Sequence, residues 1–116
     1  VIILSHALTM DRRGKVSTAR WRNRRNQMWK FLPSGQAGKY QIINAESSKP
    51  LSIRTGRILR RESNVFEVAP FDQTYYRIID DRGRALTGGI TGRVRMSGLR
   101  RGASENQLWK ITEVSQ

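Results

Sequence analysis

The feature that most constrains the fold of this chain is a short peptide that occurs near its beginning and again near its end. Residues 26–31 read Asn-Gln-Met-Trp-Lys-Phe, and residues 106–111 read Asn-Gln-Leu-Trp-Lys-Ile. A related peptide lies between them and has Phe66 where the other two have Trp29 and Trp109. The three aromatic residues are roughly 40 residues apart, and a period of this length indicates three copies of one supersecondary unit.

Other positions keep the same phase. Leu8, Leu51 and Leu86 are each followed five or six residues later by a glycine, a basic residue and a β-branched residue. An apolar run also opens each unit, at residues 1–4, 40–43 and 76–79. Short runs of β-branched and aromatic residues between turn-forming residues are typical of strands, and no segment has helical periodicity over three turns. The sequence therefore predicts an all-β chain with four strands in each repeat.

Three four-strand units that each have one small apolar face need a common core. Closing them around a pseudo-threefold axis removes the exposed sheet edges and merges the three faces. We therefore predict a β-trefoil, with Trp29, Phe66 and Trp109 packed inside. A β-sandwich would explain the strand count but not the threefold phase. The chain of 116 residues is expected to form a single domain with repeats at about residues 1–35, 36–72 and 73–116.

The composition disfavours an enzyme. The sequence has no Cys and a single His, His6, which excludes disulfides and thiolate metal sites and leaves no companion ligand for His6. We therefore expect no catalytic residue, no metal and no cofactor. The longest apolar run is residues 1–4, too short to span a membrane. Gly88–Gly92 lacks the ending of a phosphate-binding loop and is predicted to be a hairpin turn, as is the Asp80-Asp81 pair.

A strong positive charge favours an anionic partner. Lys and Arg total 22 against 9 Asp and Glu, for a net charge of +13, and most of the basic residues are Arg. Arg suits bidentate recognition of sulfate, carboxylate or phosphate, although general surface charging is the alternative. The basic residues gather in the predicted second-to-fourth-strand segments of each repeat, so threefold closure would bring them toward one end. The candidate anion-binding residues are Arg20, Arg22, Arg24, Arg25, Arg100 and Arg101.

The Gln-x-Trp peptides, each preceded by Asn, resemble the signature of the ricin-B (R-type, QxW) β-trefoil lectins. The resemblance covers the whole chain, with the full signature in the first and third repeats. It implies a core role for the tryptophans and a sugar-orienting role for the preceding Asn. The family also uses an Asp directly after the Leu of the second strand, where this chain has Thr9, Ser52 and Thr87. A hydroxyl is a weaker partner for sugar hydroxyls than a carboxylate, so the family's galactose-type pocket is not expected to be intact.

The first repeat keeps the most of the family's site. Trp21 lies where the resemblance places a stacking aromatic on the third strand, and Asp11, two residues after Thr9, could replace the missing carboxylate. A sugar can stack on an exposed indole while an amide orients its hydroxyls. The second repeat lacks Gln and Trp and is predicted to be structural. The candidate carbohydrate-binding residues are Asp11, Trp21, Asn26, Gln27, Asn106 and Gln107.

The resulting expectation is a non-catalytic module that binds a glycan or glycoprotein and prefers anionic glycans. The resemblance implies that such a module can be the targeting part of a larger toxin or enzyme complex. A β-trefoil protease inhibitor or other protein-interaction module is the alternative, with residues 22–25 or 34–39 as the exposed loop. Nonspecific nucleic-acid binding through the Arg-rich hairpins ranks third.

The compartment stays open, with secretion favoured over the cytoplasm. Absence of Cys fits a reducing compartment but also occurs in exported proteins. The first residue is Val1 and not Met, so we expect that a segment preceding it was removed or is missing.

Overall fold

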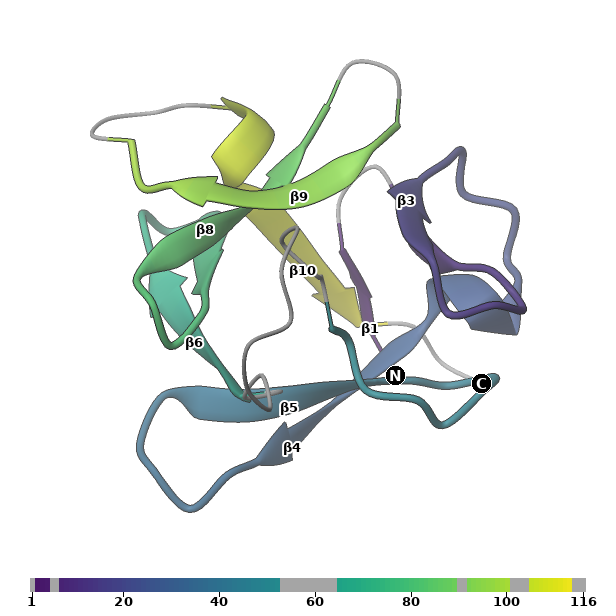
Figure 1. Ribbon diagram of the computed structural model, residues 1–116, viewed down its shortest axis with the longest axis horizontal. Coiled ribbons are helices and arrows are strands. Elements are labelled where there is room, and N and C mark those ends of the chain that lie inside the picture. The colour runs from purple at the N-terminus through teal and green to yellow at the C-terminus, as the bar shows by residue number, and fades with distance from the viewer. Residues whose placement is uncertain (1, 5–6, 53–64, 90–91, 101–104, 114–116) are drawn as a thin grey trace.

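A computed structural model describes residues 2–4, 7–52, 65–89, 92–100 and 105–113 of the chain. Its described strands are β1 (Ile2–Leu4), β2 (Leu8–Met10), β3 (Val16–Thr18), β4 (Trp29–Pro33), β5 (Lys39–Asn44), β6 (Val65–Pro70), β7 (Tyr75–Ile79), β8 (Arg84–Gly88), β9 (Val94–Gly98) and β10 (Trp109–Glu113). Two 3-10 turns, η1 (Arg25–Gln27) and η2 (Glu105–Gln107), directly precede Met28 and Leu108 (Figure 1).

Six of these strands close into a barrel. The antiparallel pairs run β10–β1, β1–β4, β4–β5, β5–β6 and β6–β7, and the pairing of β7 with β10 closes the ring. The longest ladder joins β4 to β5, with Trp29 opposite Asn44 and Pro33 opposite Tyr40. Closure leaves the barrel strands no free edge, which is the reason that three small units can share one core.

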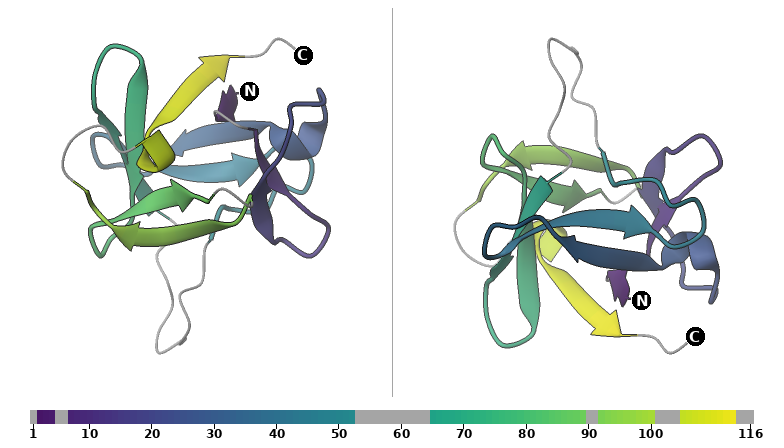
Figure 2. Two further views of the ribbon diagram at one scale, coloured as in Figure 1. Left: turned by 90° about the horizontal axis from the view of Figure 1, so that it is seen from above. Right: turned by 90° about the horizontal axis from the view of Figure 1, so that it is seen from below.

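The remaining strands form hairpins at one end of the barrel. Strands β2 and β3 pair with each other, and β8 and β9 pair along five residues each. The two hairpins lie side by side in both views of Figure 2 and touch through a bridge between Ser17 and Arg93. A hydrogen bond from the Thr18 N–H to the Gly92 carbonyl, 2.8 Å long, adds to this contact. The barrel with hairpins in its first and last units confirms the predicted all-β β-trefoil.

The core forms where the three units meet. Trp29 is fully buried, and Trp109 and Phe66 are each 3% exposed. They pack in one cluster with Leu8, Leu51, Leu86, Ile42 and Ile78. The indole N–H of Trp29 donates to the Leu8 carbonyl at 2.8 Å, and that of Trp109 donates to the Leu86 carbonyl at 2.9 Å. The predicted core equivalence of the three aromatic residues is therefore confirmed, and the two tryptophans also make equivalent polar contacts.

Short turns connect the barrel strands, and the turn predicted at Asp80-Asp81 is confirmed. Residues 34–38 connect β4 to β5, and residues 71–74 connect β6 to β7. Asp80 organises the β7–β8 turn, because its Oδ1 accepts hydrogen bonds from the N–H groups of Arg82 and Arg84. Of the predicted Gly88–Gly92 turn, residues 90–91 lie outside the described residues, and the Gly92 N–H donates to the Gly89 carbonyl at 3.1 Å. Most of the second and third strands predicted for the middle unit falls within residues 53–64, which lie outside the described residues.

Candidate functional site

A buried glutamine shapes the most basic surface loop of the described chain. Gln27 is 2% exposed and ends η1. Its Oε1 accepts a hydrogen bond from the Arg22 N–H at 2.8 Å, while its Nε2 donates to the Arg20 carbonyl at 2.8 Å and to Thr9 Oγ1 at 3.2 Å. One side-chain amide therefore holds the backbone on both sides of Trp21.

The last unit repeats this arrangement. Gln107 is fully buried, and its Oε1 accepts from the Arg100 N–H at 3.0 Å. Its Nε2 donates to the Gly98 carbonyl at 2.8 Å and approaches the hydroxyls of Ser97 and Thr87. The two signature glutamines thus have the same structural function, which is to hold the loop that follows β3 or β9.

The same network accounts for Thr9 and Thr87, at the positions where the lectin resemblance would imply an aspartate. Thr9 Oγ1 donates to the Ala7 carbonyl at 2.7 Å, and Thr87 Oγ1 donates to the Ala85 carbonyl at 2.9 Å. Each hydroxyl also accepts from its glutamine. A hydroxyl can donate and accept at once, whereas a buried carboxylate would face a carbonyl oxygen. At these two positions the described chain has an internal hydrogen-bond network and no sugar-facing carboxylate.

Trp21 is presented to the solvent by the Gln27 network. Its side chain is 37% exposed, and Arg20 and Arg22 on either side of it are exposed as well. The lectin resemblance predicted that Trp21 lies on the third strand. This prediction is wrong, because β3 ends at Thr18. Trp21 lies in the loop between β3 and η1, where Asn23 adopts a positive φ of 57°. This loop, residues 19–24, is named the Trp21 loop below.

Sequence reasoning missed the counterpart of Trp21 in the last unit. Because Arg22 and Arg100 donate to equivalent glutamines, the residues directly before them, Trp21 and Leu99, occupy equivalent positions. Leu99 is 49% exposed. Arg22 lies five residues before Gln27, whereas Arg100 lies seven residues before Gln107, so a two-residue insertion hides the correspondence. Aligning the repeats on the glutamines and allowing that insertion would have found it.

Five of the six arginines predicted to bind anions lie within the described residues. Arg20, Arg22, Arg24, Arg25 and Arg100 are exposed. Arg25 also donates from Nη2 to the Ala45 carbonyl at 3.1 Å. Three of these arginines belong to the Trp21 loop, and Arg25 begins η1 directly after it. Arg101 lies outside the described residues.

The remaining predicted sugar contacts have different environments. Asn26 is half-buried, its Nδ2 donates to the Met10 carbonyl at 3.2 Å, and its carbonyl accepts from Asn44 Nδ2 at 3.0 Å. It therefore ties η1 to β2 and β5. Asn106 is exposed. Asp11 is exposed and uses Oδ1 to accept from the N–H groups of Arg13 and Lys15, both at 2.9 Å, in the β2–β3 turn.

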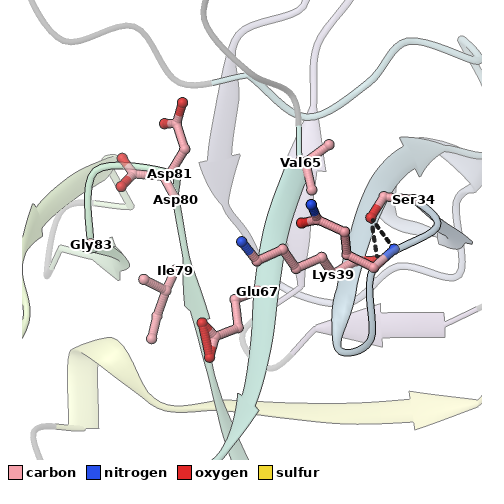
Figure 3. Close-up of a pocket in the computed structure, with 9 residues that line it drawn as sticks. Ser34, Lys39, Val65, Glu67, Ile79, Asp80, Asp81 and Gly83 are labelled. Atoms are coloured by element: carbon pink, nitrogen blue, oxygen red, sulfur yellow. Dashed lines mark hydrogen bonds between the residues drawn. The ribbon is translucent and has the colours of Figure 1, made fainter.

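A separate open groove of about 580 Å³ lies between the β4–β5 turn, β6 and the β7–β8 turn. In Figure 3 the Lys39 side chain lies between Glu67 and the Asp80-Asp81 pair, so both signs of charge line this groove. Its described lining contains no aromatic side chain. It therefore lacks the flat apolar surface on which a sugar ring stacks, which the Trp21 loop provides. Its described lining residues are Ser34, Gln36, Lys39, Val65, Glu67, Ile79, Asp80, Asp81 and Gly83.

Neither a metal site nor a membrane-spanning helix was found in the part of the chain that the structure describes. Within it, no three His, Cys, Asp or Glu side chains gather in a way that could hold a metal ion. A search of the same residues found no helix with the length and apolar character needed to cross a bilayer. His6 is outside the described residues.

Comparison with known proteins supports the fold. No family model and no curated protein matches the sequence. Among solved structures, the chain resembles the designed threefold-symmetric protein ThreeFoil, with a TM-score of 0.77 at 16% identity over 97% of this chain and 96% of that one. It is also similar to SeviL bound to the asialo-GM1 saccharide, with a TM-score of 0.74 at 15% identity over 98% and 95% of the two chains.

A third similar structure is the cytolethal distending toxin of Haemophilus ducreyi. The TM-score is 0.73 at 18% identity, over 97% of this chain and 81% of that one. These neighbours are β-trefoil proteins. Likeness at such low identity shows that the chain is a β-trefoil.

Proposed function

We propose that this chain is a non-catalytic carbohydrate-binding module and that the Trp21 loop is its principal contact surface. The observation that carries the proposal is the double hydrogen bond of buried Gln27 to the backbone of Arg20 and Arg22, which leaves the intervening indole 37% exposed. Exposing a large aromatic side chain costs hydrophobic free energy, and a fixed, exposed indole suits stacking against a sugar ring. SeviL, whose structure contains a bound saccharide, has the same fold.

The arginines beside Trp21 favour an anionic glycan. Arg20, Arg22 and Arg24 are exposed, and a guanidinium can bind sulfate or carboxylate through two parallel hydrogen bonds. The indole would contact the ring while the guanidinium groups contact its charged substituents. Asp11 Oδ2 has no hydrogen-bond partner among the described residues and is proposed to accept from a sugar hydroxyl. The amides of Gln27 and Gln107 are buried and engaged by the protein, so they support the loops and do not contact the sugar.

We propose that such a module delivers a partner protein to a glycan-bearing surface or anchors it there. Single shallow sugar sites bind with Kd values on the order of millimolar to micromolar. When several sites bind together, avidity raises the apparent affinity. Similarity to a toxin structure is consistent with a role as the targeting part of a larger complex. We propose this role together with the absence of catalytic activity.

Glycan binding by Trp21→Ala tests the proposal. Purified protein at about 0.15 M NaCl is screened against neutral, sialylated and sulfated glycans, and the best ligand is titrated. Loss of the indole is expected to weaken binding roughly tenfold, since stacking adds about 1 kcal/mol beyond area burial. Leu32→Ala is the matched control, because Leu32 is 47% exposed on β4, outside the Trp21 loop.

Two results would contradict the proposal. One is a protein that binds no glycan. The other is binding that Trp21→Ala leaves unchanged. Inhibition of a protease at micromolar concentration by a protein that ignores glycans would favour the protein-interaction alternative, and sequence-independent DNA binding that falls steeply with salt would favour the nucleic-acid one.

A further inference from the structure

A second open groove, of about 600 Å³, lies where all three units of the trefoil meet at the hairpin end. It is formed by the β2–β3 hairpin of the first unit, the segment after β5 in the middle unit, and the start of β9 in the last unit. The described lining residues are Met10, Arg13, Gly14, Lys15, Val16, Lys49, Pro50, Ser52 and Val94. None of them belongs to the Trp21 loop.

The charged side chains in the described lining of this groove all have the same sign. Three of its described lining residues, Arg13, Lys15 and Lys49, are cationic and none is acidic. The groove of Figure 3 differs, since carboxylates flank its single lysine there. Like charges in one groove repel each other, and an anion between them relieves that repulsion. The arrangement therefore favours an anionic ligand.

The backbone that carries the three cations is fixed by hydrogen bonds within the protein. Asp11 Oδ1 accepts from the N–H groups of Arg13 and Lys15, and the Lys15 carbonyl accepts from the Asp11 N–H at 2.9 Å. The Lys49 N–H donates to Ser47 Oγ at 3.2 Å, and that hydroxyl contacts Met10 Sδ at 3.4 Å. The two sides of the groove are thus connected to each other. A backbone held in this way reduces the entropy lost on binding.

The apolar lining narrows the class of ligand. Met10 and Val16 are buried side chains of the first hairpin, and Val94 and Pro50 are half-buried. A small inorganic ion would use only the cations, whereas a sugar ring with a charged substituent would also cover apolar surface. Ser52 adds an exposed hydroxyl. The lining therefore fits an organic anion of about sugar size.

We propose that this cationic groove binds a sulfate or carboxylate group of a glycan, at a site separate from the Trp21 loop. The identity of the glycan as carrier rests on the proposed function. The affinity of the groove for an anionic group does not depend on that assignment, and among the described lining residues it rests on Arg13, Lys15 and Lys49. Two separate sites on one molecule would let a single extended anionic glycan, or two glycans, be bound at once.

Isothermal titration of the full chain with a heparin-derived sulfated hexasaccharide at about 0.15 M NaCl tests this proposal. The test variant is Lys15→Gln/Lys49→Gln, and the control variant is Lys30→Gln/Arg82→Gln, which removes the same charge from exposed positions outside the groove. The test variant is expected to bind about tenfold more weakly, because two charge-assisted contacts are lost, and the control within about twofold of the parent. Circular dichroism confirms that both variants fold.

Equal weakening in the two variants would overturn the proposal, because binding would then follow net charge and not the groove. Unchanged binding in the test variant would overturn it as well. Tighter, groove-dependent binding of duplex DNA than of the hexasaccharide would overturn the glycan assignment.

The same titrations with Trp21→Ala separate this proposal from the proposed function. If Trp21→Ala binds the hexasaccharide as the parent does but Lys15→Gln/Lys49→Gln binds it more weakly, the groove proposal is supported and the Trp21 loop proposal is contradicted. If only Trp21→Ala binds it more weakly, the groove proposal is contradicted and the Trp21 loop proposal is supported.

Discussion

At the scale of single residues, the two signature glutamines show how one side chain serves core and surface together. Gln27 and Gln107 are buried, yet each fixes a loop whose neighbouring side chains are exposed. The sequence predicted that these residues matter but assigned them to the sugar. Residue type alone did not show the direction of the amide, since its partners are backbone groups whose positions depend on the loop conformation, including the positive φ of Asn23.

Replacing each glutamine with alanine separates stability from binding. Gln27→Ala and Gln107→Ala each leave a backbone N–H and a backbone carbonyl without their glutamine partner and remove one donor to a threonine hydroxyl, so each should lower the free energy of unfolding by about 2–4 kcal/mol. Only Gln27→Ala should also weaken glycan binding, by roughly tenfold, because only Gln27 holds the Trp21 loop.

Urea denaturation measures the first effect and glycan titration of the folded variants measures the second. Gln107→Ala is the control for a general loss of stability. An equal loss of glycan affinity in both variants would mean that Gln27 acts through overall stability and not through the Trp21 loop.

At the scale of elements, the contact between the two described hairpins depends on one glycine. Gly92 has a φ of +84°, and a Cβ added there would lie 2.9 Å from the Thr18 carbonyl oxygen. The same residues share the hydrogen bond that joins the hairpins. The sequence pattern of glycine, base and β-branched residue predicted the repeat, and the structure gives its reason at Gly92: strand β9 begins where the chain passes close to β3.

We expect Gly92→Ala to lower the free energy of unfolding by about 2–4 kcal/mol, because it adds backbone strain to a steric clash. Gly83→Ala is the first control, since it has a positive φ of 76° but nothing within 4 Å of the added Cβ, and should cost about 1 kcal/mol. Gly98→Ala, in open space without a positive φ, should change stability by less than about 0.5 kcal/mol. Chemical denaturation ranks the three, and a Gly92→Ala no worse than Gly83→Ala would show that the close approach to Thr18 is unimportant.

The sequence predicted core positions better than it predicted the ends of strands. Trp29, Phe66 and Trp109 were placed in the core because repeat phase and side-chain volume both require it, and the structure confirms this. Trp21 was assigned to the third strand, but β3 ends before it. The end of a strand depends on its pairing partner, as in the pair of Leu8 with Thr18, and the pattern within the strand itself does not contain that information. The cationic groove was not predicted as a site, since its lining comes from three units far apart in sequence.

At the scale of the whole molecule, a net charge of +13 is spread over a body that measures about 33 Å along each principal axis. The ion pair between Arg84 and Asp80, at 3.2 Å, lies within the described part of the chain, but nine acidic residues can neutralise only a minority of the 22 basic ones. The protein therefore folds against its own charge repulsion. At low salt, the same charge attracts anionic ligands over distances comparable to the size of the molecule.

Salt should therefore stabilise this protein. The Debye length falls from about 30 Å at 0.01 M to about 3 Å at 1 M ionic strength, so repulsion that spans the molecule at low salt is almost fully screened at high salt. We expect the free energy of unfolding to rise by about 1–2 kcal/mol between these limits in NaCl, measured by urea denaturation. A protein held together mainly by surface ion pairs would instead lose stability over this range.

Comparing the free energy of unfolding in sulfate and in chloride at equal ionic strength isolates the specific contribution of anion binding in the cationic groove. Sulfate stabilises folded proteins generally by exclusion from their surface, and this effect is expected in every variant. An anion bound in the groove adds a further stabilisation that depends on its concentration relative to Kd. The parent and Lys30→Gln/Arg82→Gln should therefore gain more from sulfate than Lys15→Gln/Lys49→Gln does. An identical gain in all three proteins would indicate that sulfate acts on this molecule through exclusion and screening alone, because the two double variants have the same net charge and differ in whether the charges were removed from the groove.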